Sequence, residues 1–227
     1  MTYVSRMQCL QAAIDQQIID MTNGASNRKV GIVAFNNEVT IVGDGHKEPQ
    51  IVTGDKLFDY DYLIQNGTQQ GIERMNLTIA ESAKKLQEKL MKLEETGPTA
   101  LGPAIASSIA MAAQGAPGST VVICTDGLAN VGLGAFDEAK TDEEITKVDE
   151  FYQKMGNLAK QHGLTINIVS IKGDECNLES LSKLAELTGG EVERVDPIDL
   201  TKNFASILSQ PIIASNVVCK VKLHKGL

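Results

Sequence analysis

The stretch STVVICTDG, residues 119–127, indicates the fold of this chain most directly. Its continuous apolar run is typical of a strand covered on both faces of a sheet, and we expect it to be the most buried strand. The run ends abruptly at Asp126 and Gly127. In an α/β protein this places a carboxylate at the carboxyl edge of the sheet, where ligands gather.

Helical and extended patterns alternate on both sides of this strand. Apolar residues recur every three or four positions in the helical stretches and form short runs in the strands. The predicted helices cover residues 7–21, 79–93, 100–113, 142–161, 177–188 and 198–208, and the other predicted strands cover 29–35, 38–42, 164–171 and 190–195. This order predicts a doubly wound α/β fold, with a mostly parallel sheet and helices on both faces.

Three segments depart from the simple alternation. Residues 38–42 follow an Asn-Asn turn and should pair with 29–35 as an antiparallel hairpin. Residues 43–77 are rich in Gly, Asp, Asn and Gln, which favours a long connection. In 215–223, apolar residues alternate with mostly charged ones, as in a half-exposed strand. We therefore expect one domain over 1–210 and a β extension, or the start of another β module, over 211–227.

Composition limits the possible functions. The net charge of −8 argues against a nucleic-acid partner, because phosphate contacts need clustered Lys and Arg. The four cysteines lie far apart without a C-x-x-C pair, so a zinc site is not expected. The sequence has no signal peptide and no apolar run near 18 residues. We therefore expect a cytoplasmic protein with no membrane span.

Thr99 and Asp126 are the candidate site residues. Taken alone, Thr99 fits an N-cap for the helix that follows it, and Asp126 fits a cap for the next turn. Together, a hydroxyl ahead of one helix and a carboxylate at the end of a strand can meet at one edge of the sheet. Such oxygen ligands, completed by waters, suit Mg²⁺. The pair therefore predicts a magnesium site.

The motifs GPTALGPAI (97–105), VVICTDGLANVG (121–132) and GLTINIVSI (163–171), followed by LSKLAELTGGEVERV (181–195), resemble the von Willebrand factor A (vWA) domain family over about residues 5–210. The resemblance implies a doubly wound fold with a metal-ion-dependent adhesion site (MIDAS). It would make Thr99 and Asp126 metal ligands and implies a protein partner that adds an acidic side chain. The loops 128–137 and 44–71 would select the partner.

The sequence lacks the family's first metal motif, D-x-S-x-S at the end of the central strand. The first predicted helix starts almost at once after Met1, and Ser5 has no Asp beside it. We therefore expect that the natural first strand is missing from this chain. Only two of five ligands remain, so Mg²⁺ binding should be weak or absent. The two strands beside the missing one should then have unpaired backbone groups. Either the strand 215–223 or another chain fills that place, or the domain is only marginally stable alone.

Three classes of function remain open. The favoured one is an intracellular, non-enzymatic protein-interaction domain that uses the incomplete metal site. The second is a metal-independent scaffold in a multiprotein complex, of ubiquitin–proteasome or vesicle-coat type. An α/β enzyme is least favoured, because no phosphate-binding glycine loop or G-x-S-x-G nucleophile elbow is present, and VGLGAF (131–136) is only a weak match. The oligomeric state is not predicted.

Overall fold

The computed structural model describes residues 4–94, 97–136, 141–172 and 178–209, together with 218 and 220. The helices, strands and 3-10 turns (η) are α1 (Arg6–Gly24), β1 (Ile32–Phe35), β2 (Val39–Gly43), β3 (Gln50–Val52), η1 (Gly54–Phe58), α2 (Tyr60–Arg74), α3 (Ile79–Leu90), α4 (Leu101–Ala112), β4 (Thr120–Thr125), α5 (Asp142–Gln161), β5 (Thr165–Ile171), α6 (Leu178–Thr188), β6 (Val192–Val195), η2 (Pro197–Asp199) and α7 (Leu200–Ser209).

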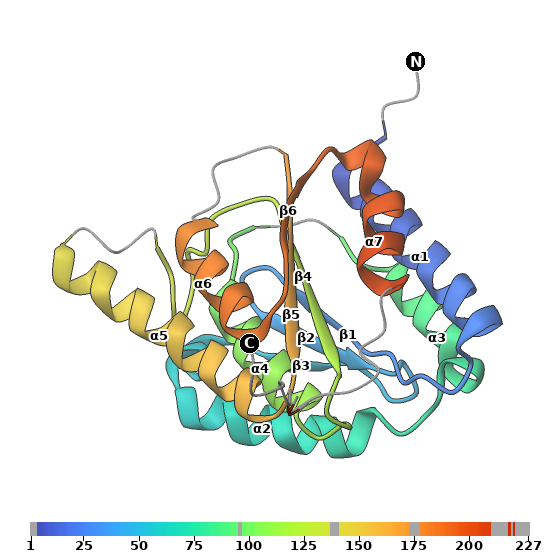
Figure 1. Ribbon diagram of the computed structural model, residues 1–227, viewed down its shortest axis with the longest axis horizontal. Coiled ribbons are helices and arrows are strands. Elements are labelled where there is room, and N and C mark those ends of the chain that lie inside the picture. The colour runs from blue at the N-terminus through green and yellow to red at the C-terminus, as the bar shows by residue number, and fades with distance from the viewer. Residues whose placement is uncertain are drawn as a thin grey trace, which may run out of the picture.

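The strands lie between two groups of helices (Figure 1). Helices α1, α3 and α7 pack together on one side, while α2, α4, α5 and α6 cover the other. Strand β5 has apolar side chains on both faces. Ile166 and Ile168 pack into the core with α4 and α5, whereas Val169 and Ile171 pack with α1 and α7. The predicted doubly wound α/β fold is therefore confirmed.

In the part of the chain that the structure describes, the strands form two sheets of three rather than one continuous sheet. Strands β4, β5 and β6 are parallel, with Thr120 opposite Thr165 and Ile168 opposite Val192. Strands β1, β2 and β3 are antiparallel, as predicted for the hairpin of β1 and β2. Among the described residues, β1 pairs with β2 alone and β4 with β5 alone. This is the arrangement expected of a sheet without its central strand.

Burial along the strands follows from this division. All four residues of β1 are only half-buried, and Thr120 to Cys124 of β4 are mostly half-buried, whereas β2 and β5 are almost fully buried. The expectation that 119–127 is the most buried strand, and that 29–35 is covered on both faces, is therefore wrong. The pattern of both strands suits a sheet interior, but within the described residues each has a neighbour on one side only.

The expectation of a long connection over residues 43–77 is also wrong, because this segment contains β3, η1 and the four-turn helix α2. Its glycines concealed the helix. A Cβ on Gly67 would lie 2.7 Å from the Ser107 backbone oxygen, and one on Gly71 would lie 2.7 Å from that of Met111. The glycines therefore allow α2 to approach α4 at backbone contact, a reason for their presence that no local pattern shows.

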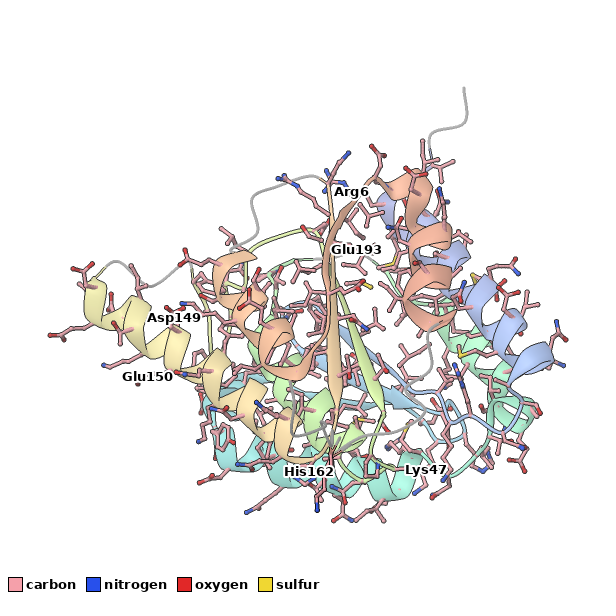
Figure 2. All side chains as sticks on the ribbon, in the orientation of Figure 1. Arg6, Lys47, Asp149, Glu150, His162 and Glu193 are labelled. Carbon is pink, nitrogen blue, oxygen red and sulfur yellow. The ribbon has the colours of Figure 1, made fainter. Side chains whose placement is uncertain are left out.

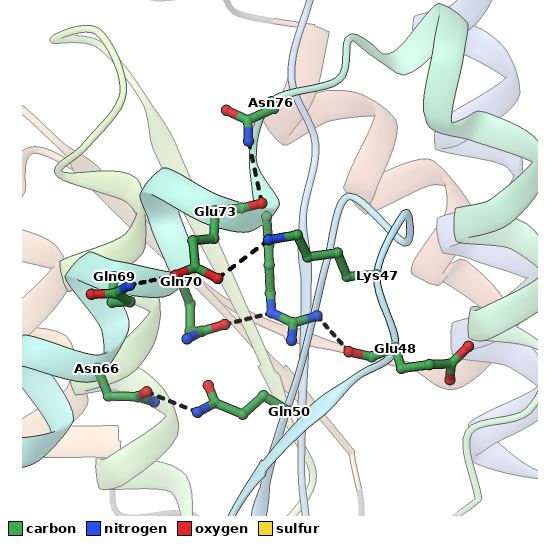
Figure 3. A network of polar contacts seen from close by, with 9 residues as sticks. Lys47, Glu48, Gln50, Asn66, Gln69, Gln70, Glu73 and Asn76 are labelled. Atoms are coloured by element: carbon green, nitrogen blue, oxygen red, sulfur yellow. Dashed lines mark hydrogen bonds and ion pairs between the residues drawn. The ribbon is translucent and has the colours of Figure 1, made fainter.

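The loop between β2 and β3 and the first residue of β3 are fixed to α2 by polar contacts (Figure 3). Lys47 Nζ donates to Glu73 Oε2 at 3.2 Å, and Gln50 Nε2 donates to Asn66 Oδ1 at 2.9 Å. Arg74 adds hydrogen bonds to Gln70 and to the Glu48 backbone oxygen. These contacts hold the antiparallel sheet against the helical layer.

The other helices lie close to their predicted positions, and α6 is followed by Gly189 at φ +70°, a left-handed conformation common after helix ends. The predicted strand 215–223 and the β extension 211–227 lie outside the described residues, apart from Val218 and Lys220, which are exposed. In the described part of the chain, we find no helix both long and apolar enough to cross a membrane.

Candidate functional site

The candidate site lies at the edge of the fold where β1 and β4 both end, which we call the carboxyl rim. Two backbone hydrogen bonds bring its segments together. The Ala100 amide, at the start of α4, donates to the Asn36 oxygen after β1 at 2.6 Å, and the Asn130 amide after β4 donates to the Thr99 oxygen at 3.1 Å. Because both strands end at this rim, β1 and β4 run in the same direction.

Thr99 is held at the rim through its backbone. Its amide donates to Asn130 Oδ1 at 2.6 Å, so the loop after β4 is fastened to the loop before α4. The N-cap position of α4 is Ala100, and no side chain caps the helix. The N-cap role considered for Thr99 is therefore wrong, and its hydroxyl is not used to start the helix.

Asp126 forms an ion pair with Arg6 and accepts a hydrogen bond from it. The sequence analysis did not predict this contact. Arg6 Nη1 lies 3.1 Å from Asp126 Oδ2, and both side chains are 39% exposed. Figure 2 shows Arg6 at the end of the molecule opposite Lys47. The guanidinium is placed by the start of α1, where Ser5 and Gln8 form a capping box. No sequence signal links positions 120 residues apart.

The residues present fit Mg²⁺ poorly. The Asp126 carboxylate already has a cationic partner in Arg6, and Ser5 Oγ accepts the Gln8 amide at 3.1 Å. No group of three His, Cys, Asp or Glu side chains able to hold a metal occurs in the described residues. Magnesium takes an octahedron of oxygen ligands and usually one or two carboxylates. A metal role for Thr99 and Asp126 stays a prediction.

Thr99, Asp126 and Arg6 all line the mouth of a groove of about 1940 Å³. We call it the central groove; it lies between β1 and β4, with α1 on one side and α4 on the other. Cys124 of β4 lies on its wall, half-buried, and burial raises the pKa of this thiol to about 12. The thiol is therefore protonated at neutral pH and is a poor nucleophile.

The loops expected to select a partner are placed differently. Residues 128–136 do lie at the carboxyl rim, since Asn130 contacts Thr99; Asp137 is outside the described residues. Most of 44–71 is strand and helix, and Lys47 lies far from Arg6 (Figure 2). From this segment, η1 reaches the rim loop, where the Leu57 backbone oxygen accepts the Leu133 amide at 3.0 Å.

The protein has a vWA-like fold, a doubly wound α/β domain with a candidate loop site at the carboxyl rim. The family model that matches this chain is the Sec23/Sec24 trunk domain, over residues 3–212. The chain therefore belongs to the Sec23/Sec24 trunk domain family. The vWA resemblance is confirmed at the level of the fold.

A search of curated proteins finds a relative in Dictyostelium discoideum, "Circularly permutated Ras protein 1", which is 36% identical over 228 residues. The match covers 100% of this chain and 26% of the relative, so the chain spans about a quarter of that protein.

Among solved structures, the human COPII-coat protein Sec24c matches with a TM-score of 0.61 and 15% identity, over 91% of this chain and 31% of its own. Proximal thread matrix protein 1 from the mussel byssus matches with a TM-score of 0.53 and 13% identity, over 89% of this chain and 41% of its own. Another structure of that protein has a MIDAS motif occupied by zinc. These likenesses show the fold.

Proposed function

We propose that this chain is a non-enzymatic, cytoplasmic protein-interaction domain that acts as a scaffold in a coat-type multiprotein assembly. Membership in the Sec23/Sec24 trunk family supports this class, and the likeness to a COPII-coat protein agrees with it. The proposed contact surface is the carboxyl rim, formed by the Asp126 region, the loop 128–136 and the start of α1.

We further propose that the rim binds its partner without Mg²⁺, and the ion pair between Arg6 and Asp126 is the observation that carries this. In a metal-dependent site, a cation would offset the Asp126 charge and attract a partner's carboxylate. Here a guanidinium stands beside Asp126 at 3.1 Å.

The absence of catalysis is part of the proposal. The sequence supports it, because it contains no phosphate-binding glycine loop and no G-x-S-x-G nucleophile elbow. Turnover assays of the purified chain with common esters and nucleotides test this point, and we expect no hydrolysis above the rate in buffer.

Capture of partners from cell extract with the immobilised chain tests the interaction. We expect coat-type or scaffold proteins to be retained equally in the presence of a chelator and in the presence of Mg²⁺, since no metal is needed. Asp126→Lys should abolish capture, because it replaces the ion pair with repulsion from Arg6 at 3.1 Å.

Glu73→Lys is the matched control, because Lys47 and Glu73 form an ion pair at 3.2 Å with similar exposure, far from the rim. It should leave capture unchanged. Capture that needs Mg²⁺ and disappears with chelator would contradict the metal-independent proposal and restore the MIDAS hypothesis. Equal loss with Asp126→Lys and Glu73→Lys would contradict the rim as the contact surface.

A further inference from the structure

Tyr60 and Lys154 form a close contact on the outer side of the helical layer. The Nζ atom of Lys154, on α5, lies 3.3 Å from the centre of the Tyr60 ring at the start of α2. Figure 2 shows Glu150 of the same helix α5 far from Arg6. Because the face of an aromatic ring attracts an ammonium group, the Tyr60 ring already binds a cation, supplied by the chain itself.

An open pocket of about 400 Å³ lies at this contact. Tyr60 lines it from α2, and the other lining residues come from α5. Gln153, Asn157 and Gln161 are spaced four residues apart, so their side-chain amides form one row along the helix. Leu158, which is half-buried, adds an apolar surface. The pocket therefore combines an aromatic ring, a small apolar surface and a row of hydrogen-bonding amides.

Glu150 gives the pocket a negative charge. It lines the pocket one helical turn before Lys154, the spacing at which Glu and Lys commonly pair on a helix. Lys154 lies over Tyr60 instead, and Glu150 forms no ion pair with any residue that the structure describes. Burial, and then the negative charge of Asp61, raise the pKa of Tyr60. These charges make the pocket suitable for a cation.

Tyr62 forms a similar contact outside the pocket. Lys56 Nζ lies 5.0 Å from the centre of the Tyr62 ring, and the two residues belong to η1 and α2. Tyr62 does not line the pocket. Since positions two residues apart face different sides of a helix, Tyr60 and Tyr62 are separate sites, and Tyr62 can serve as an internal control.

We propose that this pocket is a docking site for an arginine side chain of a partner protein, carried on a basic segment, which displaces Lys154 from the Tyr60 ring. A planar guanidinium stacks on an aromatic ring, and its five N–H groups can donate to the Glu150 carboxylate and to the amide oxygens of α5. The net charge of −8 attracts a basic segment. This second contact surface is separate from the carboxyl rim.

NMR titration of the full chain tests the proposal with two probe peptides of equal length and charge, Gly-Arg-Ser-Arg-Gly and Gly-Lys-Ser-Lys-Gly. We expect the arginine peptide to shift the ring signals of Tyr60 and the side-chain amide signals of Gln153 and Asn157. It should bind about threefold more tightly than the lysine peptide, because only a guanidinium can both stack and donate in a plane. The ring signals of Tyr62 should not move.

Substitutions separate the role of the ring from that of the lysine. Tyr60→Leu should weaken binding of the arginine peptide about tenfold, because it removes the ring face, whereas Tyr60→Phe should retain binding. Lys154→Met should tighten binding about twofold, since it removes the cation that occupies the ring. Lys147→Met is the matched control, because Lys147 is an exposed lysine of α5 that does not line the pocket, and it should have no effect.

Several results would overturn the proposal. They are equal affinities for the arginine and lysine peptides, equal shifts of the Tyr60 and Tyr62 rings, and a Tyr60→Leu variant that binds as well as the unmodified chain. Weaker binding by Lys154→Met would also contradict it, because Lys154 would then be part of the binding surface rather than a competitor. Asp126→Lys should leave the Tyr60 shifts in place, which separates this site from the rim contact.

Discussion

Arg6 and Asp126 are 120 positions apart in sequence but form an ion pair of 3.1 Å across the mouth of the central groove. The pair joins the first turn of α1 to the residue that follows β4. A charge that the sequence assigns to a metal site is thereby balanced within the chain.

Removal of this ion pair should have a small effect on stability and none on metal binding. We expect Arg6→Gln to lower the free energy of unfolding by less than about 1 kcal/mol, because both side chains are 39% exposed to solvent. Urea denaturation measures the change, which should shrink further in 1 M salt. A Mg²⁺-dependent rise of the melting temperature in this variant would show instead that Arg6 excludes a metal.

Replacement of Gln17 should stabilise the free chain. The buried side-chain nitrogen of Gln17 has no partner among the described residues, so Gln17→Leu removes an unsatisfied donor and should raise the free energy of unfolding by about 1–2 kcal/mol. Gln16→Leu is the control, because Gln16 is an exposed neighbour that bonds Asp20. A destabilised Gln17→Leu variant would show that this amide is satisfied in solution.

The close contact of α2 with α4 should not tolerate a single methyl group. In Gly67→Ala the new Cβ would lie 2.7 Å from the Ser107 oxygen and 2.8 Å from the Ala110 Cβ. We expect a loss of about 1–3 kcal/mol, measured by thermal or chemical denaturation. Gly24→Ala, where nothing lies within 4 Å, should be neutral or slightly stabilising. Equal stability of the two variants would contradict the described packing.

Ser180 and Lys183 of α6 bind the Asp149 carboxylate of α5. The Ser180 hydroxyl, and then Lys183 at 3.0 Å, hold the pKa of Asp149 below its usual value. A lowered pKa in the folded state gives stability above the unfolded pKa of about 3.9, and this stability is lost as pH falls through the folded value.

Ser180→Ala should therefore cost about 1 kcal/mol at pH 7 and progressively less below pH ~4. Denaturation at both pH values, with an NMR titration of Asp149, checks this. A difference that does not depend on pH would contradict it.

Local patterns were sufficient to predict most helices and strands, because apolar periodicity records which face of each element is buried. They were insufficient for α2, because Gly67 and Gly71 are needed for its close contact with α4, which is distant in the sequence. Burial of β4 was also mispredicted. Its apolar sequence suits a strand between two neighbours, and one of those neighbours is not among the described strands.

The candidate site was predicted only in part, because local patterns show where strands end and helices begin but do not show tertiary contacts. Thr99 and Asp126 both line the mouth of the groove, as expected from a loop before a helix and a strand end at one edge of a sheet. Their metal role stays a prediction. Arg6 was missed because an ion pair between α1 and β4 depends on tertiary placement, which one sequence does not encode in any short motif.

Amide hydrogen exchange of the free chain tests the central claim, that β1 and β4 are unpaired along the groove, most directly. The account predicts that about half of the amides between Thr120 and Thr125 exchange orders of magnitude faster than those between Ile168 and Ser170, which are paired on both sides by β4 and β6. Protection of every β4 amide at the level of β5 would contradict it, because the groove would then already be closed by a strand.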